Sequence, residues 1–355
     1  MSAHITRSRA IGAAALAAAA GLALTACGGS SSDSVSITGE GSTAQQKAMK
    51  HFGDVLTDND GPVLDYTGSG SGDGVKKFLS GDVDFAGSDS ALKDDEVAQA
   101  KTRCGGNDAW NLPMVAGPVA IAYNLPGVDK LTLNASVLGQ IFDSKIAKWN
   151  DPKIAALNPG VNLPDVAVVP VHRTDSSGTT DNFTRFLNVA APADWPHEHS
   201  KEWAGAGGSG ASKSTGVGDT VQKTAGAITY VEWGFATENK LGVANLDFGA
   251  GSTALTAETA GAALNAATFK TPGSKDLAVD TDALYKLSAP GAYPLVLTTY
   301  EIVCSAGYKD AATADSIKKA FTLILDKGQD GLADLGYVPL PQAFQTNLRG
   351  SIDAL

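Results

Sequence analysis

The sequence is poor in positive charge, in cysteine and in histidine. Its 355 residues include 27 Lys and Arg against 38 Asp and Glu, a formal net charge of −11, which argues against binding to nucleic acid or another extended polyanion. Three cysteines and five histidines provide few ligands for a structural metal site. With 43% hydrophobic and 18% charged residues, disorder is excluded for most of the chain, and the length suggests roughly two or three domains.

Two catalytic motifs do not occur in the sequence. There is no Gly-x-Ser-x-Gly, so the nucleophile elbow of a hydrolase is absent, and no Gly-Lys pair, so a Walker A loop is absent. A secreted phosphatase that uses Ser71 or Ser177 as its nucleophile remains an alternative, although only His172 lies nearby in the sequence as a base. We interpret His172 as the last residue of a strand.

A dinucleotide-binding enzyme is a second alternative. Gly39-x-Gly41-x-x-Ala44 follows an expected strand and opens an expected helix, and Asp65 follows about 24 residues later, close to the spacing of the Rossmann fingerprint. The motif is short and has a high false-positive rate. It also leaves the polar loop that begins at Arg173 unexplained.

The first residues have the pattern of an export signal. Arg7 and Arg9 precede an apolar run over 10–24, roughly 15 residues and therefore shorter than the ~20 residues that span a bilayer. Small residues follow this run, as they do at a cleavage site. We therefore expect a signal peptide over 1–26. The residue that follows it indicates that it is a lipoprotein signal peptide.

That residue is a cysteine. Leu24-Thr25-Ala26-Cys27 resembles a bacterial lipobox, in which the cysteine is lipidated and becomes the first residue of the mature protein. The next residues are Gly, Ser and Asp, a composition typical of a flexible tether over 27–34. We expect lipidation at Cys27, which places the protein outside the cytoplasm, anchored to the outer face of the cell membrane.

Two cysteines remain for the mature chain, Cys104 and Cys304. In an oxidising compartment we favour a disulfide between them, with two separate thiols as the alternative, because one sequence does not fix connectivity. His197 and His199 lie beside prolines in an expected loop. Structural zinc normally needs four clustered ligands, so we expect neither a metal site nor a cofactor.

The rest of the chain alternates short β-branched runs with amphipathic segments, which is typical of an α/β fold. In three places a strand pattern leads through a loop rich in Gly, Ser and Thr to a helix pattern: 39–44, 68–74 and 173–179. In the first loop, Thr43 and Gln46 fit a capping box and predict a helix that begins at Thr43. A helix N-terminus offers unpaired amides to an anion, so three such loops predict an anion site where they meet.

The third loop adds a permanent charge. Arg173 can contact an oxyanion through two N–H groups, and Asp175 is placed to hold its guanidinium. The segment 83–89 reads as a further strand that ends at Asp89. A carboxylate that faces an anion is unfavourable unless the anion donates a proton. Phosphate keeps a proton at neutral pH and sulfate does not, so a buried Asp89 would select phosphate.

These motifs resemble the periplasmic-type phosphate-binding proteins of bacterial phosphate ABC transporters. The resemblance covers nearly all of the mature chain and rests on 38–43, 68–72, 83–89 and 173–179, with weaker support from 214–218, 226–232 and 293–295. It implies a receptor that binds inorganic phosphate and delivers it to membrane permease subunits. It further implies a monomer whose contact with the membrane is its lipid anchor. Another oxyanion, sulfate, remains the alternative ligand.

The resemblance also implies a fold and a set of ligand contacts. The fold is α/β with two lobes, a hinge and an interlobe ligand cleft, the periplasmic-binding-protein or Venus flytrap fold. Lobe I would comprise 35–118 and 296–355, and lobe II 119–295. Asp175 would support Arg173. The implied phosphate contacts are Thr43, Ala44, Ser71, Asp89, Arg173, Ser177, Gly178 and Thr179.

Two residues depart from the family pattern. The family usually has an aromatic residue where Ala44 stands, which leaves the side-chain cover of the cleft open. It commonly has a neutral residue where Asp73 stands. Because a carboxylate that points into the cleft would oppose anion binding, we expect Asp73 to face solvent or to cap its helix.

Overall fold

The structure, a computed structural model, describes residues 36–355. The expected signal peptide, the lipidation site Cys27 and the tether lie outside the described residues. None of the helices within 36–355 has the length and apolar character that a membrane span requires. Strands and helices alternate along much of this range, as the sequence predicts.

The strands are mostly short, with two long exceptions, β4 and β12. They are β1 (Ser36–Gly41), β2 (Val63–Gly68), β3 (Phe85–Ser88), β4 (Ala109–Tyr123), β5 (Thr132–Asn134), β6 (Val169–Arg173), β7 (Ser209–Ala211), β8 (Ala227–Glu232), β9 (Gly242–Val243), β10 (Asn245–Asp247), β11 (Ser252–Thr253) and β12 (Val296–Cys304).

The α-helices lie between these strands and at the C-terminal end. They are α1 (Gln46–Asp58), α2 (Ser71–Ser80), α3 (Asp94–Arg103), α4 (Ala135–Phe142), α5 (Pro152–Leu157), α6 (Gly178–Ala190), α7 (Lys213–Lys223), α8 (Trp233–Glu238), α9 (Ala257–Asn265), α10 (Thr281–Tyr285), α11 (Ala311–Leu323) and α12 (Gln342–Ile352). A π-helical turn η1 (Ile324–Gly328) and a 3-10 turn η2 (Ala333–Leu335) follow α11.

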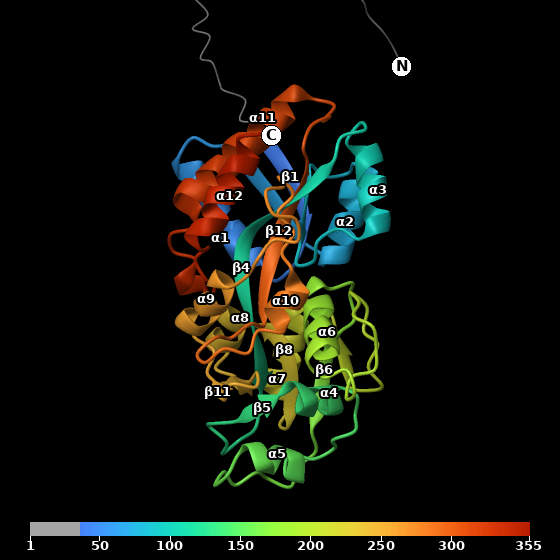
Figure 1. The fold of residues 1–355 in the computed structure, drawn as a ribbon, viewed down its shortest axis with the longest axis vertical. Coiled ribbons are helices and arrows are strands. Elements are labelled where there is room, and N and C mark those ends of the chain that lie inside the picture. Colours follow the sequence, from blue (N-terminus) through green and yellow to red (C-terminus); the bar gives the residue numbers. More distant parts are fainter. Residues whose placement is uncertain (1–35) are drawn as a thin grey trace, which may run out of the picture. The chain divides into compact units, whose positions relative to one another are not determined.

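Most of the strands belong to one sheet that changes partners halfway along β4. Among the described residues its order is β2-β1-β3-β12-β4-β8-β6-β7, with β9 also paired to β4. β4 pairs with β12 as far as Pro118 opposite Val296, and from Val119 it pairs with β8 instead. We call β1, β2, β3, β12 and 109–118 the first sheet section, and 119–123, β6, β7, β8 and β9 the second. Figure 1 shows β4 running from the first section into the second, with β12 beside its first part.

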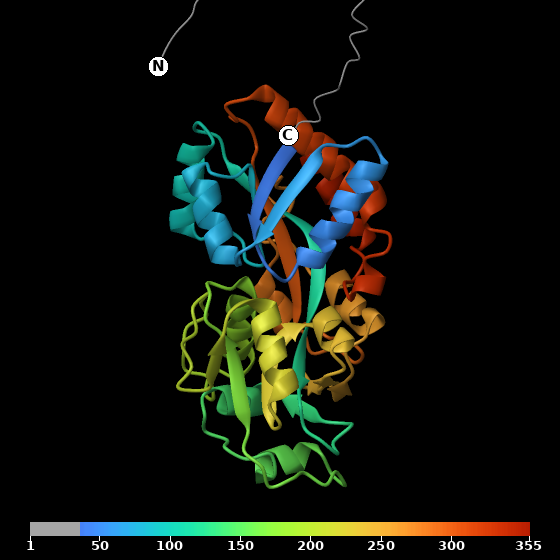
Figure 2. The same cartoon turned by 180° about the vertical axis from the view of Figure 1, so that it is seen from behind.

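The central strands are almost completely buried, because helices and loops cover both of their faces. Every residue of β12 is buried, and so is every residue of β4 from Asn111 onward. Strands buried on both faces read as continuous apolar runs rather than as alternating patterns. Seen from behind, α1 and α2 lie on opposite sides of the β1–β2 pair (Figure 2).

The first helix begins later than the capping pattern predicts. α1 starts at Gln46, and its N-cap residue Gln45 makes no side-chain capping bond. The Thr43 hydroxyl lies 2.8 Å from the hydroxyl of Ser214, which is 171 positions away in the sequence. The predicted start at Thr43 was therefore wrong, because a distant hydroxyl replaces the local partner. The helix is amphipathic nonetheless and buries Ala48, Met49, Phe52 and Leu56.

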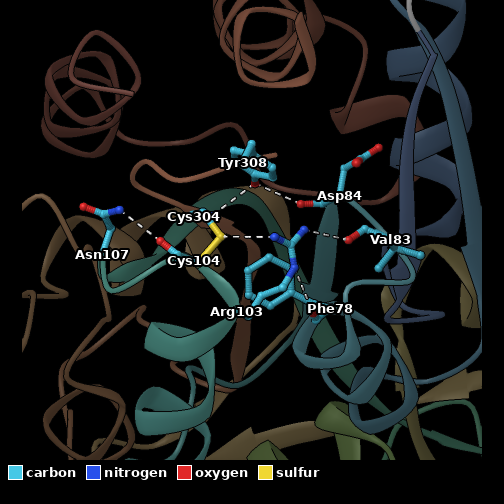
Figure 3. The surroundings of a disulfide bond; sticks show 8 residues. All are labelled: Phe78, Val83, Asp84, Arg103, Cys104, Asn107, Cys304 and Tyr308. Atoms are coloured by element: carbon cyan, nitrogen blue, oxygen red, sulfur yellow. Dashed lines mark hydrogen bonds between the residues drawn. A yellow bond between two sulfur atoms is a disulfide. The ribbon is translucent and has the colours of Figure 1, made fainter. Parts of the chain in front are cut away.

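A disulfide joins Cys104, at the end of α3, to Cys304, at the end of β12, with their Cα atoms 5.3 Å apart. Both cysteines are buried. Arg103 lies beside them between two aromatic rings, with its guanidinium carbon 5.3 Å from the ring centres of Phe78 and Tyr308 (Figure 3). Its Nε donates to the Phe78 carbonyl at 3.1 Å. The disulfide therefore links α3 covalently to β12, a central strand of the first sheet section.

Candidate anion-binding site

The polar loops meet where strands of both sheet sections end. β1 and β3 are parallel neighbours, so the residues after Gly41 and Ser88 leave the first section at the same edge. β6 and β8 are parallel neighbours in the second section. The Gly72 N–H donates to the Ser176 carbonyl at 3.0 Å, so the loops of the two sections are in direct contact. In α/β proteins the carboxyl ends of strands are the usual place for a ligand.

Arg173, the last residue of β6, provides a buried cation at this place. Its side chain is 2% exposed. Nε donates to Asp175 Oδ1 at 2.7 Å, and Nη2 bonds to Oδ2 of the same carboxylate. Burial alone would raise the pKa of Asp175, but its bonds to the guanidinium and the guanidinium charge lower it. Asp175 therefore holds the Arg173 guanidinium from one side, in the position that the sequence pattern suggests.

Asp89, which follows β3, provides a buried carboxyl group surrounded by hydroxyls. Ser42 Oγ and Thr299 Oγ1 donate to its Oδ1 at 2.6 and 2.9 Å. The hydroxyls of Ser71 and Thr179 lie 3.3 and 3.4 Å from its Oδ2. Burial raises the pKa of Asp89, and the hydroxyl donors and the guanidinium charge only partly oppose it. Burial therefore makes the ionised form of Asp89 harder to maintain than that of an exposed aspartate.

The start of α6 provides free donors. Ser177 is the N-cap, and its Oγ accepts the Thr180 N–H at 3.1 Å. The Ser177 amide donates to the Lys201 carbonyl at 2.9 Å, so this amide already has a partner. The amides of Gly178 and Thr179 make no hydrogen bond to any other described residue, as expected in the first turn of a helix.

The first two loops approach the same place. The Ser71 amide at the start of α2 has no hydrogen-bond partner within 36–355, whereas the Ala44 amide donates to Ser42 Oγ at 3.1 Å. Gly70 precedes Ser71 with φ of 115°. A Cβ at Gly70 would lie 2.9 Å from Asp175 Oδ2, so only glycine allows this close approach.

A cavity of about 760 Å³ adjoins this cluster. Thr43, Ala44, Ser214 and Glu232 are among the residues that line it. The ring of Tyr337 lines it too, and its hydroxyl donates to the Ala44 carbonyl at 2.8 Å, so an aromatic side chain from a distant segment stands beside this alanine.

The second departure from the family pattern lies away from the cluster. Asp73 is 49% exposed, and its carboxylate lies 3.5 Å from the ammonium group of Lys76 one turn along α2. The side chain therefore faces solvent, as expected, and does not oppose an anion in the cleft.

Four polar residues of the cluster are absent from the set that the sequence predicts. Ser42 directly precedes Thr43 and could have been included on that ground. Thr299 lies in an apolar strand that gives no functional signal. Ser214 and Glu232 belong to the segments 214–218 and 226–232, which supported the family resemblance but pointed to no contact. Glu232 accepts the Thr179 hydroxyl at 3.2 Å, and Ser214 accepts Arg173 Nη1 at 3.5 Å.

The two histidines of the loop between α6 and β7 pair with separate aspartates. His197 Nε2 lies 2.8 Å from Asp143 Oδ1, and His199 Nδ1 lies 2.6 Å from Asp181 Oδ1. Over the described part of the chain, no cluster of three or more His, Cys, Asp or Glu is arranged to hold a metal ion.

Comparison with known proteins gives one consistent family. A family model described as a PBP superfamily domain matches residues 28–319. Phosphate-binding protein PstS 3 of Mycobacterium leprae is 42% identical over 93% of this chain and 88% of its own length. Phosphate-binding protein PstS 2 of Mycobacterium tuberculosis is 40% identical over 96% of this chain and 97% of its own.

Solved structures share the fold. A high affinity periplasmic phosphate-binding protein (PfluDING) bound with phosphate has a TM-score of 0.73 at 25% identity, with 89% of this chain and 93% of that chain covered. A phosphate-binding protein from Stenotrophomonas maltophilia has a TM-score of 0.69 at 21% identity over the same shares. The expected two-lobed α/β fold is thereby confirmed. By sequence and by fold, the chain belongs to the PBP superfamily and, within it, to the family of the PstS phosphate-binding proteins.

Proposed function

We propose that this protein is an extracytoplasmic receptor that binds inorganic phosphate in its interlobe cleft and delivers it to the permease subunits of an ABC transporter. The observation that carries the proposal is the arrangement of a buried cation, Arg173, and a buried carboxyl, Asp89, around hydroxyls and unpaired amides. Relatives over 40% identical that are named phosphate-binding proteins support it. So does the structural likeness to PfluDING bound with phosphate.

The proposed contacts are sufficient for tight binding. A hydrogen bond to a charged group contributes about 1.5–3 kcal/mol, and micromolar affinity needs about 8.2 kcal/mol, so several such bonds suffice even after the cost of ordering the loops. Ser177 would contribute its hydroxyl, because its amide donates to Lys201. The donors and acceptors in the proposal are Thr43, Ala44, Ser71, Asp89, Arg173, Ser177, Gly178 and Thr179. The Ala44 amide donates to Ser42 Oγ and would have to exchange this partner for the ligand.

Asp89 would give the site its preference for phosphate over sulfate. It is 3% exposed, so an anion beside it must offset the unfavourable contact between two negative charges. Phosphate does so by donating its remaining proton to the carboxylate, and sulfate has none to donate.

Closure of two lobes would complete the site. We assign 35–118 with 296–355 to lobe I and 119–295 to lobe II. The hinge would lie where the chain passes between the lobes, at 118–119 within β4 and at 295–296 before β12. The change of partner on β4 at Pro118 and Val119, opposite the start of β12, supports these limits. Thr43, Ser71 and Asp89 then belong to one lobe and 173–179 to the other, so a ligand that binds all of them favours the closed state.

We assign the protein to the outer face of the cell membrane as a monomer held by a lipid on Cys27; the signal pattern of 1–26 supports this.

A receptor role without catalysis is supported by the surroundings of His172. Its ring stacks on Trp203 at a centroid distance of 4.7 Å, and its Nδ1 lies 3.1 Å from the Arg173 carbonyl. The base that a serine phosphatase would require is therefore engaged elsewhere.

The test is a calorimetric titration of the purified protein, freed of bound anion, with phosphate and with sulfate near neutral pH. We expect tight phosphate binding and no sulfate binding. In Asp89→Asn the ratio of the two affinities should narrow by at least about tenfold, because a charged hydrogen bond of about 1.5–3 kcal/mol is lost. An unchanged ratio contradicts the role of Asp89, and a folded protein that binds neither anion contradicts the proposed function.

The matched control is Asp143→Asn. Asp143 is also a buried aspartate, but it contacts His197, Lys145 and the Ala206 amide rather than the cluster. The phosphate-to-sulfate ratio should stay unchanged in this variant, so that a general effect of removing a buried carboxylate is separated from a specific one.

A further inference from the structure

One hydroxyl of the site lies between two buried carboxyl groups. Thr179 Oγ1 is 3.2 Å from Glu232 Oε1 and 3.4 Å from Asp89 Oδ2. A hydroxyl has one proton, so it can donate to one of these groups at a time. If both groups were ionised, one carboxylate would lose this donor. If one carries a proton, it can donate to the threonine oxygen, and the chain of hydrogen bonds is complete.

The charges around the cluster also favour a proton on one of the two carboxyl groups. The Asp175 carboxylate binds the Arg173 guanidinium through two hydrogen bonds on one edge, and these two charges largely offset each other. Asp89 and Glu232 are 3% and 7% exposed. Two ionised carboxylates in such surroundings would repel each other and the anion that binds beside them. Burial raises the pKa of both groups, and the guanidinium only partly opposes this.

We propose that Glu232 holds a proton that it shares with Asp89 through the Thr179 hydroxyl, and that this proton determines how phosphate affinity falls as the pH rises. The inference rests on the proposed function, because it concerns the same site. Glu232 would be a positioning and charge-setting residue, since it acts through Thr179 and by its charge. Neutral Glu232 leaves Asp89 as the carboxylate that accepts the ligand proton.

The other ionisable groups near Glu232 offset only part of the negative charge. They come from several elements: Arg173 on β6, Asp89 after β3, Tyr337 after η2, and Lys47 and Lys213 in the wall of the adjoining cavity. The Lys47 ammonium forms an ion pair with Glu238 at 2.5 Å. Lys213 Nζ donates to the Gly68 carbonyl at 2.7 Å and keeps its charge, so one further cation faces two carboxyl groups and the bound anion.

The direction of the effect follows from the charge. As the pH rises through the raised pKa of Glu232, the group ionises and adds a negative charge beside the anion. Phosphate binding must then take up a proton, so affinity should fall by an additional factor of up to about tenfold for each pH unit. The titration of phosphate itself adds a further change, which is the same for every variant of the protein.

The experiment measures phosphate affinity from about pH 5 to about pH 9, a range that covers ordinary and raised carboxyl pKa values. Glu232→Gln keeps the shape and the acceptor oxygen but cannot ionise. We expect this variant to bind phosphate more tightly than the unaltered protein at the alkaline end, with the ratio of the two affinities growing as the pH rises. Parallel profiles overturn the inference. Absence of phosphate binding in the unaltered protein overturns the proposed function instead.

The matched control is Glu301→Gln. Glu301 on β12 is a buried glutamate whose pKa is raised well above its usual range by burial and by the charge of Asp89. Its bonding partner is Gln45, and among the described residues no hydroxyl links it to Asp89 as Thr179 links Glu232. Its profile should parallel that of the unaltered protein. An alkaline gain in this variant as well would overturn the assignment to Glu232.

A second measurement needs no variant. Calorimetry of phosphate binding in buffers of different ionisation enthalpy gives the number of protons taken up. At the alkaline end we expect uptake approaching one proton per phosphate. No net uptake there overturns the inference, even if Glu232→Gln fails to fold.

Discussion

Asp181 shows how a buried charge is kept in this protein. It lies in the first turn of α6, is 3% exposed, and accepts His199 Nδ1 at 2.6 Å on one oxygen and the Ser90 hydroxyl at 2.6 Å on the other. Burial alone would raise the pKa of Asp181, but the bonds from His199 and Ser90 outweigh it and lower the pKa. Ser90 follows β3, so this carboxylate also connects the two sheet sections.

The lowered pKa of Asp181 predicts a pH-dependent contribution to stability. The unfolded chain has a carboxyl pKa of about 3.9, so the stabilisation is present above that pH and is lost as the pH falls through the lower pKa of the folded state. Asp181→Asn should reduce the free energy of unfolding at pH 7 by about 1–3 kcal/mol. The measurement is urea denaturation of both proteins at neutral and at acid pH. The difference between their free energies of unfolding should be smaller at acid pH.

Asp219→Asn is the control for this prediction. Its carboxylate is half exposed and lies 4.0 Å from Lys223, the kind of surface pair that contributes little. Stability should be unchanged in this variant at both pH values. A difference for Asp181→Asn that is equally large at acid pH would contradict the charge-based explanation.

The sequence predicts individual residues well where partners are close along the chain. Arg173 and Asp175 are two positions apart, and their pairing follows from that spacing. Thr299 contacts Asp89 from 210 positions away, and Glu232 reaches Thr179 across 53. Such contacts depend on strand order and register, which local patterns do not contain. Asp89 was therefore predictable as a candidate, and so were Ser71 and Thr179 beside it, whereas Ser42 and Thr299 were not.

Among the elements, α3 and β12 are tied covalently by Cys104 and Cys304 (Figure 3). A bond between positions 200 apart strongly restricts the unfolded chain. Replacing both cysteines by alanine should lower the free energy of unfolding by about 2–5 kcal/mol, measured by urea denaturation without reductant. An unchanged free energy of unfolding would mean that packing around Arg103 alone is sufficient to hold α3 against β12.

Local sequence patterns predict some features of the helices and strands but not others. The α/β alternation and the start of α6 after an N-cap serine follow from residue order. The start of α1 did not, because the Thr43 hydroxyl contacts Ser214 rather than the backbone of its own helix. A capping pattern thus predicts a helix more reliably than it predicts the exact first residue.

At the scale of the whole molecule, the contact between the loops of the two sheet sections depends on the absence of a side chain at Gly72. A Cβ at this position would lie 2.5 Å from Ser176 Cβ and 2.0 Å from Ser176 Oγ. Gly72 lies within α2, where alanine is the better helix former by about 0.8–1 kcal/mol. A substitution there should therefore oppose closure without harming the lobe that carries it.

Gly72→Ala should weaken phosphate binding about five- to 150-fold, because overpacking of about 1–3 kcal/mol falls on the closed state. Stability in the absence of phosphate should be equal or slightly higher. Calorimetry and urea denaturation measure the two quantities. Adding Ser176→Gly removes the clashing atoms and should restore the affinity. Lower stability without phosphate, or no recovery in the double variant, would contradict this account.

The position of β12 between β3 and β4 has a consequence for synthesis. The ribosome completes β3 and β4 early, but the strand that separates them emerges only after the whole of β5 to β11. Until then both neighbours present unpaired backbone groups and apolar side chains, which favour pairing with other chains. A nascent or truncated chain that ends before Val296 therefore lacks the centre of its first sheet section. Such a chain should aggregate unless a chaperone holds it.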